Sequence, residues 1–281
     1  MHQYCDLHTH SNYSDGTCSP AEIIAQAETL RLCAVALTDH NTVAGLPEFL
    51  SAAQNKSVEA IAGVEISTNY DETELHIVGL FLKPETFGTI AAFLENFNQK
   101  KEESNRLLIH NLNRAGCHLD YSEICRAHPK GTVNRAVIAA SLLEKGYVSS
   151  INDAFNGLLS KKAGYYIPPE RLSSFDAIDF LQSVGAVPVL AHPFLNLKTE
   201  KALRHFLTEA VSHGLAAMET IYSSYSPETE ALARHIALEF GLKESGGSDF
   251  HGQTKPHIAL GSGKGNLAVP AVFAKALKNG I

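Results

Sequence analysis

The stretch Cys33-Ala-Val-Ala-Leu-Thr38 is a short, largely apolar run, and Asp39-His40 follows it directly. An apolar run of this length is typical of a strand buried on both faces, as strands of a parallel sheet are. A helix is predicted after it, near residues 46–54. The segment therefore indicates a strand–helix unit with a potential metal ligand, His40, at the carboxyl end of its strand.

The same unit recurs on both sides of this stretch. Further strands are predicted at 4–8, 58–64, 75–82, 186–190, 217–221 and 243–246, and further helices at 20–32, 174–184, 201–213 and 227–240. Strands that alternate with helices indicate parallel strand–helix–strand units. The predicted fold class is therefore α/β, and about seven strands favour a barrel over an open sheet.

Between these units the pattern changes. Residues 84–168 are richer in charge, with one or two amphipathic helices predicted at 90–115 and shorter helices at 134–145 and 152–160. We therefore predict a barrel domain formed by residues 1–83 and 169–281. Residues 84–168 are predicted to be a helical insertion that covers the active site.

Composition limits the functional classes. The chain has 281 residues, 44% of them hydrophobic, and its formal charge of -7 excludes a uniformly basic nucleic-acid-binding protein. The amino terminus shows no signal peptide, and no apolar run approaches the ~18 residues that span a bilayer. Five cysteines without regular spacing indicate free thiols. We expect a cytoplasmic protein without a membrane association or an obligate protein partner.

Histidine is abundant, with fourteen residues against two methionines and no tryptophan. Many histidines and acids stand where predicted strands stop, although His76 stands near a strand start. Because the carboxyl ends of parallel barrel strands converge on one face, these side chains can meet there. The candidate metal ligands are His8, His10, Asp15, His40, Glu65, His76, His192, Asp249 and His251.

These ligand types suit divalent cations. Imidazole and carboxylate bind Mn, Fe and Zn, and nine ligands are too many for one ion, so two or three ions are expected, with Mn2+ favoured over Fe2+ or Zn2+. Alone, a His-x-His pair or His192-Pro193 is more often structural, so the indication comes from their conjunction. Asp39 has two interpretations: it caps the following helix or orients His40.

Seven motifs surround the candidate ligands. They are Asp6-Leu-His8-Thr-His10-Ser, Ser14-Asp15-Gly16, Leu37-Thr-Asp39-His40-Asn-Thr42, Gly63-Val-Glu65-Ile-Ser67, His76-Ile-Val-Gly79, Ala191-His192-Pro193 and Gly247-Ser-Asp249-Phe-His251. In this order they closely resemble the motifs of the PHP (polymerase and histidinol phosphatase) superfamily. The resemblance implies a distorted, TIM-like (β/α)7 barrel with a metal site at its carboxyl-terminal face.

The resemblance also implies a division of the ligands among metals. Glu65 would bridge two ions and, together with His192 and Asp249, would belong to the catalytic residues. The first ion would be held by His8, His10, Glu65 and Asp249, the second by Glu65, His76 and His192, and the third by Asp15, His40 and His251.

The helical region resembles a narrower group, whose members hydrolyse nucleoside 3',5'-bisphosphates or remove nucleotides from RNA 5' ends. Members carry Arg-Pro-His before a helix, where this chain has Asn134-Arg135-Ala-Val137, so only the arginine matches. His128 is a candidate to replace the missing histidine. The predicted substrate-binding residues are Arg135, Lys161, Lys162, His128 and Tyr222. The alternatives are a surface charge for Arg135 and a solvated loop for the two lysines.

The leading hypothesis is metal-dependent hydrolysis of a phosphate monoester on a nucleoside 3',5'-bisphosphate, a nucleoside monophosphate or an RNA 5' end. One alternative is a histidinol-phosphate phosphatase, which would need acidic groups in place of the basic helical region. Another is a non-catalytic metal-binding module, against which the complete ligand set argues.

Overall fold

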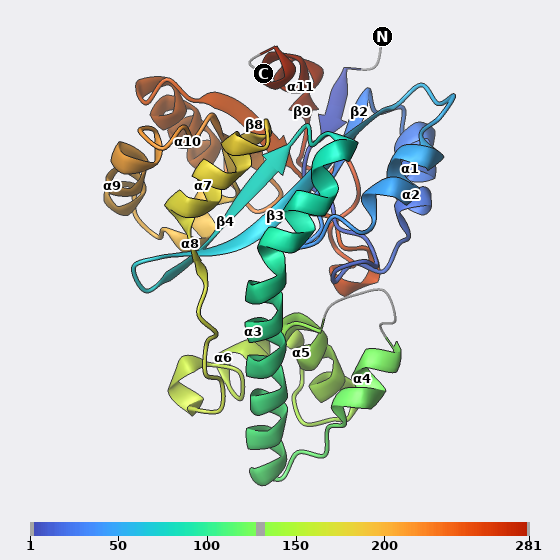
Figure 1. Cartoon of the computed structure of the whole chain (residues 1–281), viewed down its shortest axis with the longest axis vertical. Helices are drawn as coiled ribbons and strands as arrows, with labels where there is room; N and C mark the ends of the chain where they lie inside the picture. Colours follow the sequence, from blue (N-terminus) through green and yellow to red (C-terminus); the bar gives the residue numbers. More distant parts are fainter. Residues whose placement is uncertain (1–2, 128–132, 280–281) are drawn as a thin grey trace.

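The computed structural model describes residues 3–127 and 133–279, and its centre is a sheet curved into a nearly closed barrel (Figure 1). Along the sheet the strands lie in the order β8-β7-β6-β4-β3-β2-β1-β9, and β5 pairs with β3. The predicted α/β barrel is confirmed. The strands within the described residues are β1 (Tyr4–Asp6), β2 (Ala34–Leu37), β3 (Glu59–Tyr70), β4 (Thr73–Leu80), β5 (Leu172–Ser173), β6 (Val187–Leu190), β7 (Ala217–Tyr222), β8 (Lys243–Gly247) and β9 (Val269–Pro270).

Backbone contacts between β8 and β1 bring the two sides of the barrel together. The amide of Leu7 donates to the carbonyl of Gly246 over 3.2 Å, and the amide of Asp249 donates to the carbonyl of His8 over 2.9 Å. Gly247 permits this approach, since a Cβ there would lie 2.4 Å from the Cβ of His8. The segments that carry His8 and Asp249 are thus fixed to each other by the main chain.

Strand β4 departs from the predicted parallel pattern, because it runs antiparallel to both β3 and β6. The prediction that the third strand ends at Glu65 is wrong: β3 has 12 residues, reaches Tyr70 and turns back into β4 as a hairpin. An antiparallel strand begins where its parallel neighbours end. This reversal explains why His76, near the start of β4, lies at the same face as ligands from strand ends.

Helices surround the barrel on two sides, with α1 and α2 on one and α7, α9 and α10 on the other (Figure 1). None of the described helices is long and apolar enough to cross a membrane. The helices are α1 (Pro20–Thr29), α2 (Leu46–Ala52), α3 (Phe87–Arg114), α4 (Tyr121–Ala127), α5 (Arg135–Glu144), α6 (Ile151–Asn156), α7 (Ser174–Ser183), α8 (Pro193–Asn196), α9 (Glu200–Ala210), α10 (Pro227–Glu239) and α11 (Ala271–Lys278), with short 3-10 turns η1 (Pro84–Thr86), η2 (Lys161–Ala163) and η3 (Gly252–Thr254).

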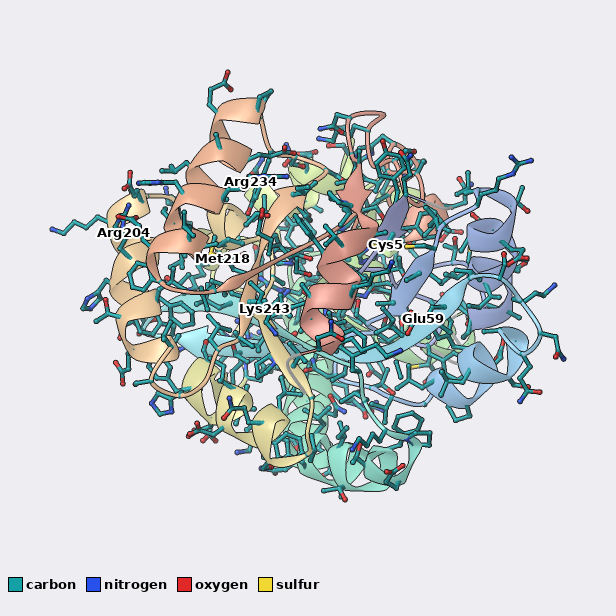
Figure 2. All side chains as sticks on the ribbon, turned by 90° about the horizontal axis from the view of Figure 1, so that it is seen from above. Cys5, Glu59, Arg204, Met218, Arg234 and Lys243 are labelled. Carbon is teal, nitrogen blue, oxygen red and sulfur yellow. The ribbon has the colours of Figure 1, made fainter. Side chains whose placement is uncertain are left out.

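Helix α11 covers the amino-terminal end of the barrel. Figure 2 looks onto this end and shows α11 beside the first residues of the strands, among them Cys5 of β1 and Glu59 of β3. Leu277 of α11 is fully buried against the core that contains Cys5, and Lys278 pairs with Glu59 over 2.7 Å. With this end packed by side chains, the opposite, carboxyl-terminal end is the one available for a site.

Helix α3 connects the barrel to the helical region below it in Figure 1. Its 28 residues span about 42 Å. Near its start, Ile90 and Leu94 are buried in the barrel core, whereas Leu108 and Leu112 belong to a separate apolar cluster formed within residues 108–166. Each fully buried leucine contributes roughly 1.5–3 kcal/mol. The helical region therefore has a core of its own, and α3 is shared by both cores.

Candidate active site

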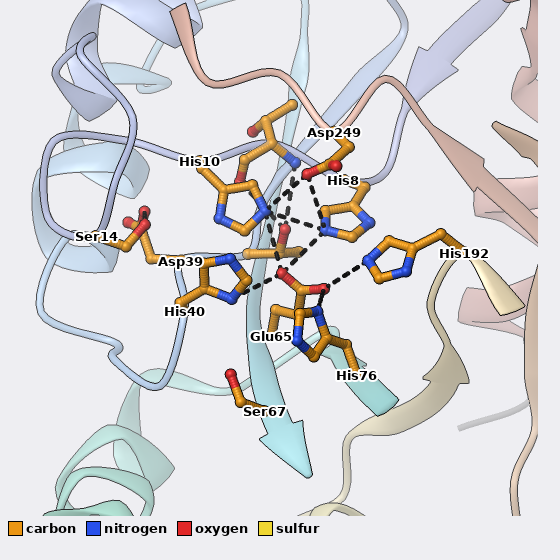
Figure 3. A network of polar contacts seen from close by, with 12 residues as sticks. His8, His10, Ser14, Asp39, His40, Glu65, Ser67, His76, His192 and Asp249 are labelled. Atoms are coloured by element: carbon orange, nitrogen blue, oxygen red, sulfur yellow. Dashed lines mark hydrogen bonds and ion pairs between the residues drawn. The ribbon is translucent and has the colours of Figure 1, made fainter. Parts of the chain in front are cut away.

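The structure brings all nine predicted metal ligands together at the carboxyl-terminal end of the barrel. Figure 3 shows His8, His10, His40, His76, His192 and Asp249 around the carboxylate of Glu65. The remaining two, Asp15 and His251, lie on the side of His10, with the His251 Nε2 3.2 Å from the Asp15 carboxylate. We call these nine residues the cage.

Glu65 lies at the centre of the cage and is fully buried. Its Oε2 is 3.3 Å from His8 Nε2, 3.2 Å from His10 Nε2 and 3.0 Å from His40 Nδ1. Its Oε1 is 2.8 Å from His76 Nδ1 and 3.1 Å from His192 Nε2. Because each oxygen faces a different set of imidazoles, this carboxylate has the geometry of a bridge between two ions.

Four overlapping groups of ligand atoms within the described residues lie close enough to share an ion. They are His8, His10 and Asp249; His8, Glu65 and His192; His40, Glu65 and His76; and His10, Asp15, His40 and His251.

The charges of the cage are strongly coupled. Burial raises the pKa of the Glu65 carboxyl, but the imidazoles of His40 and His76 outweigh it and hold this pKa well below its usual range. Burial lowers the pKa of His10 and of His76, yet nearby carboxylates raise the pKa of each to about 9. For His40 burial dominates, and its pKa falls to about 4. Without cations, the carboxylates are anionic and some imidazoles hold protons that cations would replace.

Two observations show that the residues fit bound cations. The Nε2 atoms of His8 and His10 are 3.1 Å apart, a separation expected of two ligands on one ion with bonds of about 2.1 Å. Four buried cage atoms have no hydrogen-bond partner among the described residues: His10 Nδ1, His40 Nδ1, His192 Nδ1 and Glu65 Oε2. An unsatisfied buried polar atom costs about 1–3 kcal/mol. Cations in the cage would satisfy the carboxylate and order the rings.

Glu219, which the ligand prediction omitted, positions two ligands at once. Its Oε1 accepts a hydrogen bond from His8 Nδ1 over 2.7 Å, and its Oε2 accepts one from the backbone amide of His192 over 2.6 Å. A carboxylate on the far nitrogen of a histidine fixes the ring and directs the other nitrogen to a metal. The signal in the sequence is a charged residue inside the apolar strand β7.

Asp39 holds the loop of residues 11–15 and does not cap the following helix, and among the described residues no hydrogen bond joins its carboxylate to His40. Its carboxylate accepts hydrogen bonds from the Ser11 amide, over 2.7 Å, and from the Ser11 and Ser14 hydroxyls, over 2.6 Å each. Helix α2 instead begins after Gly45 without a side-chain cap. Asp39 therefore fixes the loop that carries Asp15.

Asp6, on the neighbouring strand β1, plays the same part for the segment that carries Asp249. It accepts hydrogen bonds from the Ser248 amide and hydroxyl, over 2.8 and 2.5 Å, and from the Gly261 amide, over 2.8 Å. Ser248 directly precedes Asp249, whose φ of 58° is left-handed and strained for a residue with a side chain. The Asp6 contacts stabilise this conformation.

Asp249 divides its carboxylate between the cage and two further side chains. Oδ1 faces His10 Nε2 over 3.3 Å, and Oδ2 accepts hydrogen bonds from the Tyr222 hydroxyl and the Lys255 ammonium, each over 2.7 Å. Burial and the adjacent Asp249 raise the pKa of Tyr222 well above its usual value, so its hydroxyl stays a donor. Tyr222, predicted to bind substrate, thus contacts a cage ligand, and Lys255 was not predicted.

Two adjoining cavities open beside the cage. The larger, about 430 Å3, lies over the cage and is lined by His40, His76, His192, Asp249, Tyr222 and Lys255; we call it the cage cavity. The smaller, about 220 Å3, reaches from Asp15 and His40 to the helical region and contains Lys101, Arg135 and Arg171; we call it the cationic pocket. Glu74, His76, Arg135 and Phe155 line both cavities, so the two share a wall.

Arg135 is held in a fixed position in the cationic pocket. Its guanidinium donates to Glu74 Oε2 over 2.8 Å and lies 4.5 Å from the centre of the Tyr166 ring. Arg171 contacts the same Glu74 oxygen over 2.8 Å. Burial lowers the pKa of the third cation, Lys101, despite the opposing effect of Asp15 and Glu74. Three carboxylates line the same pocket, and each has a partner: Glu74 pairs with both arginines, Glu170 with Lys100, and Asp15 with the cage residue His251.

The other predicted substrate residues lie elsewhere. Neither Lys161 nor Lys162 lines the cationic pocket or the cage cavity, and the Lys161 side chain is 67% exposed, 3.9 Å from Glu72. His128 lies outside the described residues. Lys101 and Arg171 were missed because α3 and the segment before β5 carry no motif that marks them, and only folding brings them to Arg135.

Comparisons with known proteins agree with this geometry. A 5'-3' exoribonuclease of Haemophilus influenzae is 32% identical over 246 residues, 88% of this chain and 89% of that protein. A 3',5'-nucleoside bisphosphate phosphatase of Chromobacterium violaceum is 29% identical over 249 residues, 88% of this chain and 86% of that protein. A solved structure from Bifidobacterium adolescentis, described as a metal-dependent phosphoesterase, gives a TM-score of 0.85 at 26% identity and covers 97% of this chain and 94% of that chain.

The family itself is shown by a match to the PHP domain over residues 6–235, a range that contains seven of the nine cage residues, all except Asp249 and His251. The fold, the cage and this match lead to one conclusion: the chain belongs to the PHP domain family and is a metal-dependent phosphoesterase.

Proposed function

We propose that this phosphoesterase removes one phosphate from a nucleoside 3',5'-bisphosphate. The observation that supports the proposal is the cationic pocket beside the cage, with Lys101, Arg135 and Arg171. The two phosphates of such a substrate lie on opposite sides of the ribose, so one group of cations cannot hold both. The cage would take the reacting phosphate, and the cationic pocket would take the other.

In this proposal the nine cage residues hold two or three divalent cations, with Glu65 as the bridge and with Glu65, His192 and Asp249 nearest to the reaction. Bound cations would lower the pKa of water and neutralise charge on the phosphate. We propose Mn2+ before Fe2+ or Zn2+, since the ligands are a mixture of imidazole and carboxylate. Glu219, Asp39 and Asp6 keep the ligands oriented.

The chain's own residues would set the substrate's position. Arg135, held by Glu74 and by the face of Tyr166, presents a planar guanidinium that can bind two phosphate oxygens at once. Phe155 lines both cavities and offers a face for a nucleobase or ribose. Residues 84–168 would be the insertion that supplies these groups and excludes water from the cage.

Two other substrates are alternatives. An RNA 5' end is the second candidate, because the Haemophilus influenzae relative is named an exoribonuclease. Histidinol phosphate fits less well, because its amine is a cation and the adjoining pocket holds three cations. The carboxylates of that pocket are already engaged, Glu74 by Arg135 and Arg171, Glu170 by Lys100 and Asp15 by His251.

The test is a phosphate-release assay on the Mn2+-loaded full chain. It compares adenosine 3',5'-bisphosphate, AMP, histidinol phosphate and a short 5'-phosphorylated RNA. We expect the highest kcat/KM on the bisphosphate, with AMP lower because it cannot use the cationic pocket. A higher kcat/KM on histidinol phosphate would overturn the proposal, and preference for the RNA would select the second candidate.

A further inference from the structure

Lys255 is a cation at the cage that the ligand set does not explain. It follows η3, and its segment is fixed by hydrogen bonds from the Lys255 amide to the Gly252 carbonyl and from the Thr254 hydroxyl to the Asp15 carbonyl. Its ammonium lies 2.7 Å from Asp249 Oδ2, and the side chain is 37% exposed. The loop therefore presents the ammonium at the wall of the cage cavity.

The two cavities share Arg135 but differ in their other cations. Lys255 lines the cage cavity with the ligands His40, His76 and His192, whereas Lys101 and Arg171 line only the cationic pocket. The proposed position of the reacting phosphate is the cage cavity. Lys255 is therefore the lysine on the side of the reaction, and Lys101 is the lysine on the side of the second phosphate.

We propose that Lys255 is a catalytic residue that binds a non-bridging oxygen of the reacting phosphate. This inference depends on phosphoesterase activity at the cage but not on the identity of the rest of the substrate. An ammonium has three donors, and the hydrogen bond to Asp249 is the single one found for it among the described residues. Two donors remain for phosphate oxygens.

These two donors can stabilise the charge that develops on the phosphate during the reaction. The water oxygen bonds to phosphorus and gives up a proton to solvent, while the ester oxygen leaves with the bonding electrons and takes up a proton. Negative charge collects meanwhile on the non-bridging oxygens. An ammonium that is already held in place stabilises that charge without rearrangement. Asp249 holds the ammonium in place, while its other oxygen faces the cage, so one carboxylate sets the distance between Lys255 and the cations.

The experiment compares Lys255→Met with Lys101→Met and Tyr222→Phe in the Mn2+-loaded full chain. Lys255→Met should lower kcat/KM on 4-nitrophenyl phosphate and on adenosine 3',5'-bisphosphate by a similar factor, about 10- to 150-fold. It should weaken inhibition by inorganic phosphate and leave the metal content, measured by elemental analysis, at the wild-type value. Lys101→Met should lower kcat/KM on the bisphosphate more than on 4-nitrophenyl phosphate.

Tyr222→Phe is the matched control for the contact with Asp249, because it removes a neutral donor to the same oxygen. It should cause a smaller loss and should not change phosphate inhibition. Loss of metal by Lys255→Met would overturn the proposal and leave Lys255 as a residue that only positions Asp249, as would wild-type phosphate inhibition.

Lys255→Arg keeps the charge and should recover part of the activity. If Lys255→Met does not fold, the activity and phosphate inhibition of Lys255→Arg test the proposal in its place. A wild type that prefers another substrate would contradict the proposed function but not this inference, which 4-nitrophenyl phosphate tests alone.

Discussion

The cage and the cationic pocket lie against each other, yet they are assembled in opposite ways. The cage takes its ligands from barrel segments whose main chains bond to one another, as the Asp249 amide does to the His8 carbonyl. The cationic pocket takes Lys101 from α3, Arg135 from α5 and Arg171 from the segment before β5, and these meet through side chains around Glu74. The backbone fixes the first site, whereas tertiary packing of a second core fixes the other.

This difference indicates that the barrel determines the reaction and the helical region determines the substrate. A barrel that fixes the metals can keep one reaction, hydrolysis of a phosphate ester, while helices on a separate core change the substrate. Glu74 joins the two, because its carboxylate contacts both arginines and lies 3.5 Å from Nε2 of the ligand His76. Substitutions should therefore separate into those that affect all substrates and those that affect one class.

The largest expected effect is metal removal, which acts on the cage alone. Chelation should reduce activity on every phosphate ester to background, and Mn2+ should restore it better than Ca2+, because imidazole ligands favour transition metals. The melting temperature should also fall, since the folded state binds the ions. Activity in protein shown by elemental analysis to be metal-free would contradict this role of the cage.

Removal of single ligands should be nearly as severe. Glu65→Ala takes away the carboxylate that both sets of imidazoles face, and Asp249→Ala takes away a ligand that Lys255 and Tyr222 also hold. Each should lose bound metal and about 10³-fold or more of kcat on any substrate. His235→Ala changes a histidine whose side chain is 64% exposed and serves as the control. Normal turnover by Asp249→Ala would show that Asp249 is not a metal ligand.

The cage could be predicted from the sequence because its residues stand in recognisable local patterns. Short apolar runs that end in His or Asp predicted strands with ligands at their ends. Because the ends of parallel strands meet at one face, this pattern placed ligands from residues 8 to 251 together. The length of β3 was missed, since Ile66–Tyr70 lacks the apolar character of a buried strand and extends as a hairpin with β4. The antiparallel direction of β4 was also missed, and it is what puts His76 at the site.

The cationic pocket could be predicted only in part. Arg135 was found through family resemblance, but Lys101 stands in the middle of a charged helix, where nothing local separates it from Lys100. Its position depends on the angle at which α3 leaves the barrel, which is set by packing of two cores. Arg171 similarly follows Pro168-Pro169-Glu170, a segment without periodicity.

Arg135→Ala should have a smaller and selective effect that sharpens the comparison. Loss of one charge-assisted hydrogen bond costs about 1.5–3 kcal/mol, or roughly 10- to 150-fold in kcat/KM on the bisphosphate. Hydrolysis of 4-nitrophenyl phosphate, which has no second phosphate, should change little. Arg135→Lys should recover only part, because an ammonium cannot replace the planar fork.

Lys161→Ala is the control for this experiment, because it removes a cation from the exposed loop nearby. It should cause a smaller loss than Arg135→Ala on the bisphosphate. Equal losses on both substrates would place Arg135 at the reacting phosphate or in the fold, and no loss on either would make it a surface charge.

Glu219→Gln should have the smallest effect of the series and the most specific cause. The carboxylate accepts hydrogen bonds with both oxygens, from His8 Nδ1 and from the His192 amide. An amide has one oxygen and one NH2 group, so either orientation turns one of these contacts into two donors facing each other. The shape of the side chain is kept, and the buried core around β7 should be undisturbed.

Metal affinity or activity should therefore fall by about 10- to 100-fold on all substrates, as is usual when the partner of a metal-bound histidine is removed. A titration with Mn2+ measures the metal affinity, and the melting temperature of the metal-free protein shows separately whether the variant is folded. Glu239→Gln, a change on the surface of α10, is the control. A normal Mn2+ affinity for Glu219→Gln would mean that backbone contacts alone hold His8 and His192 in place. The cage would then depend on the main chain even more than its side-chain contacts indicate.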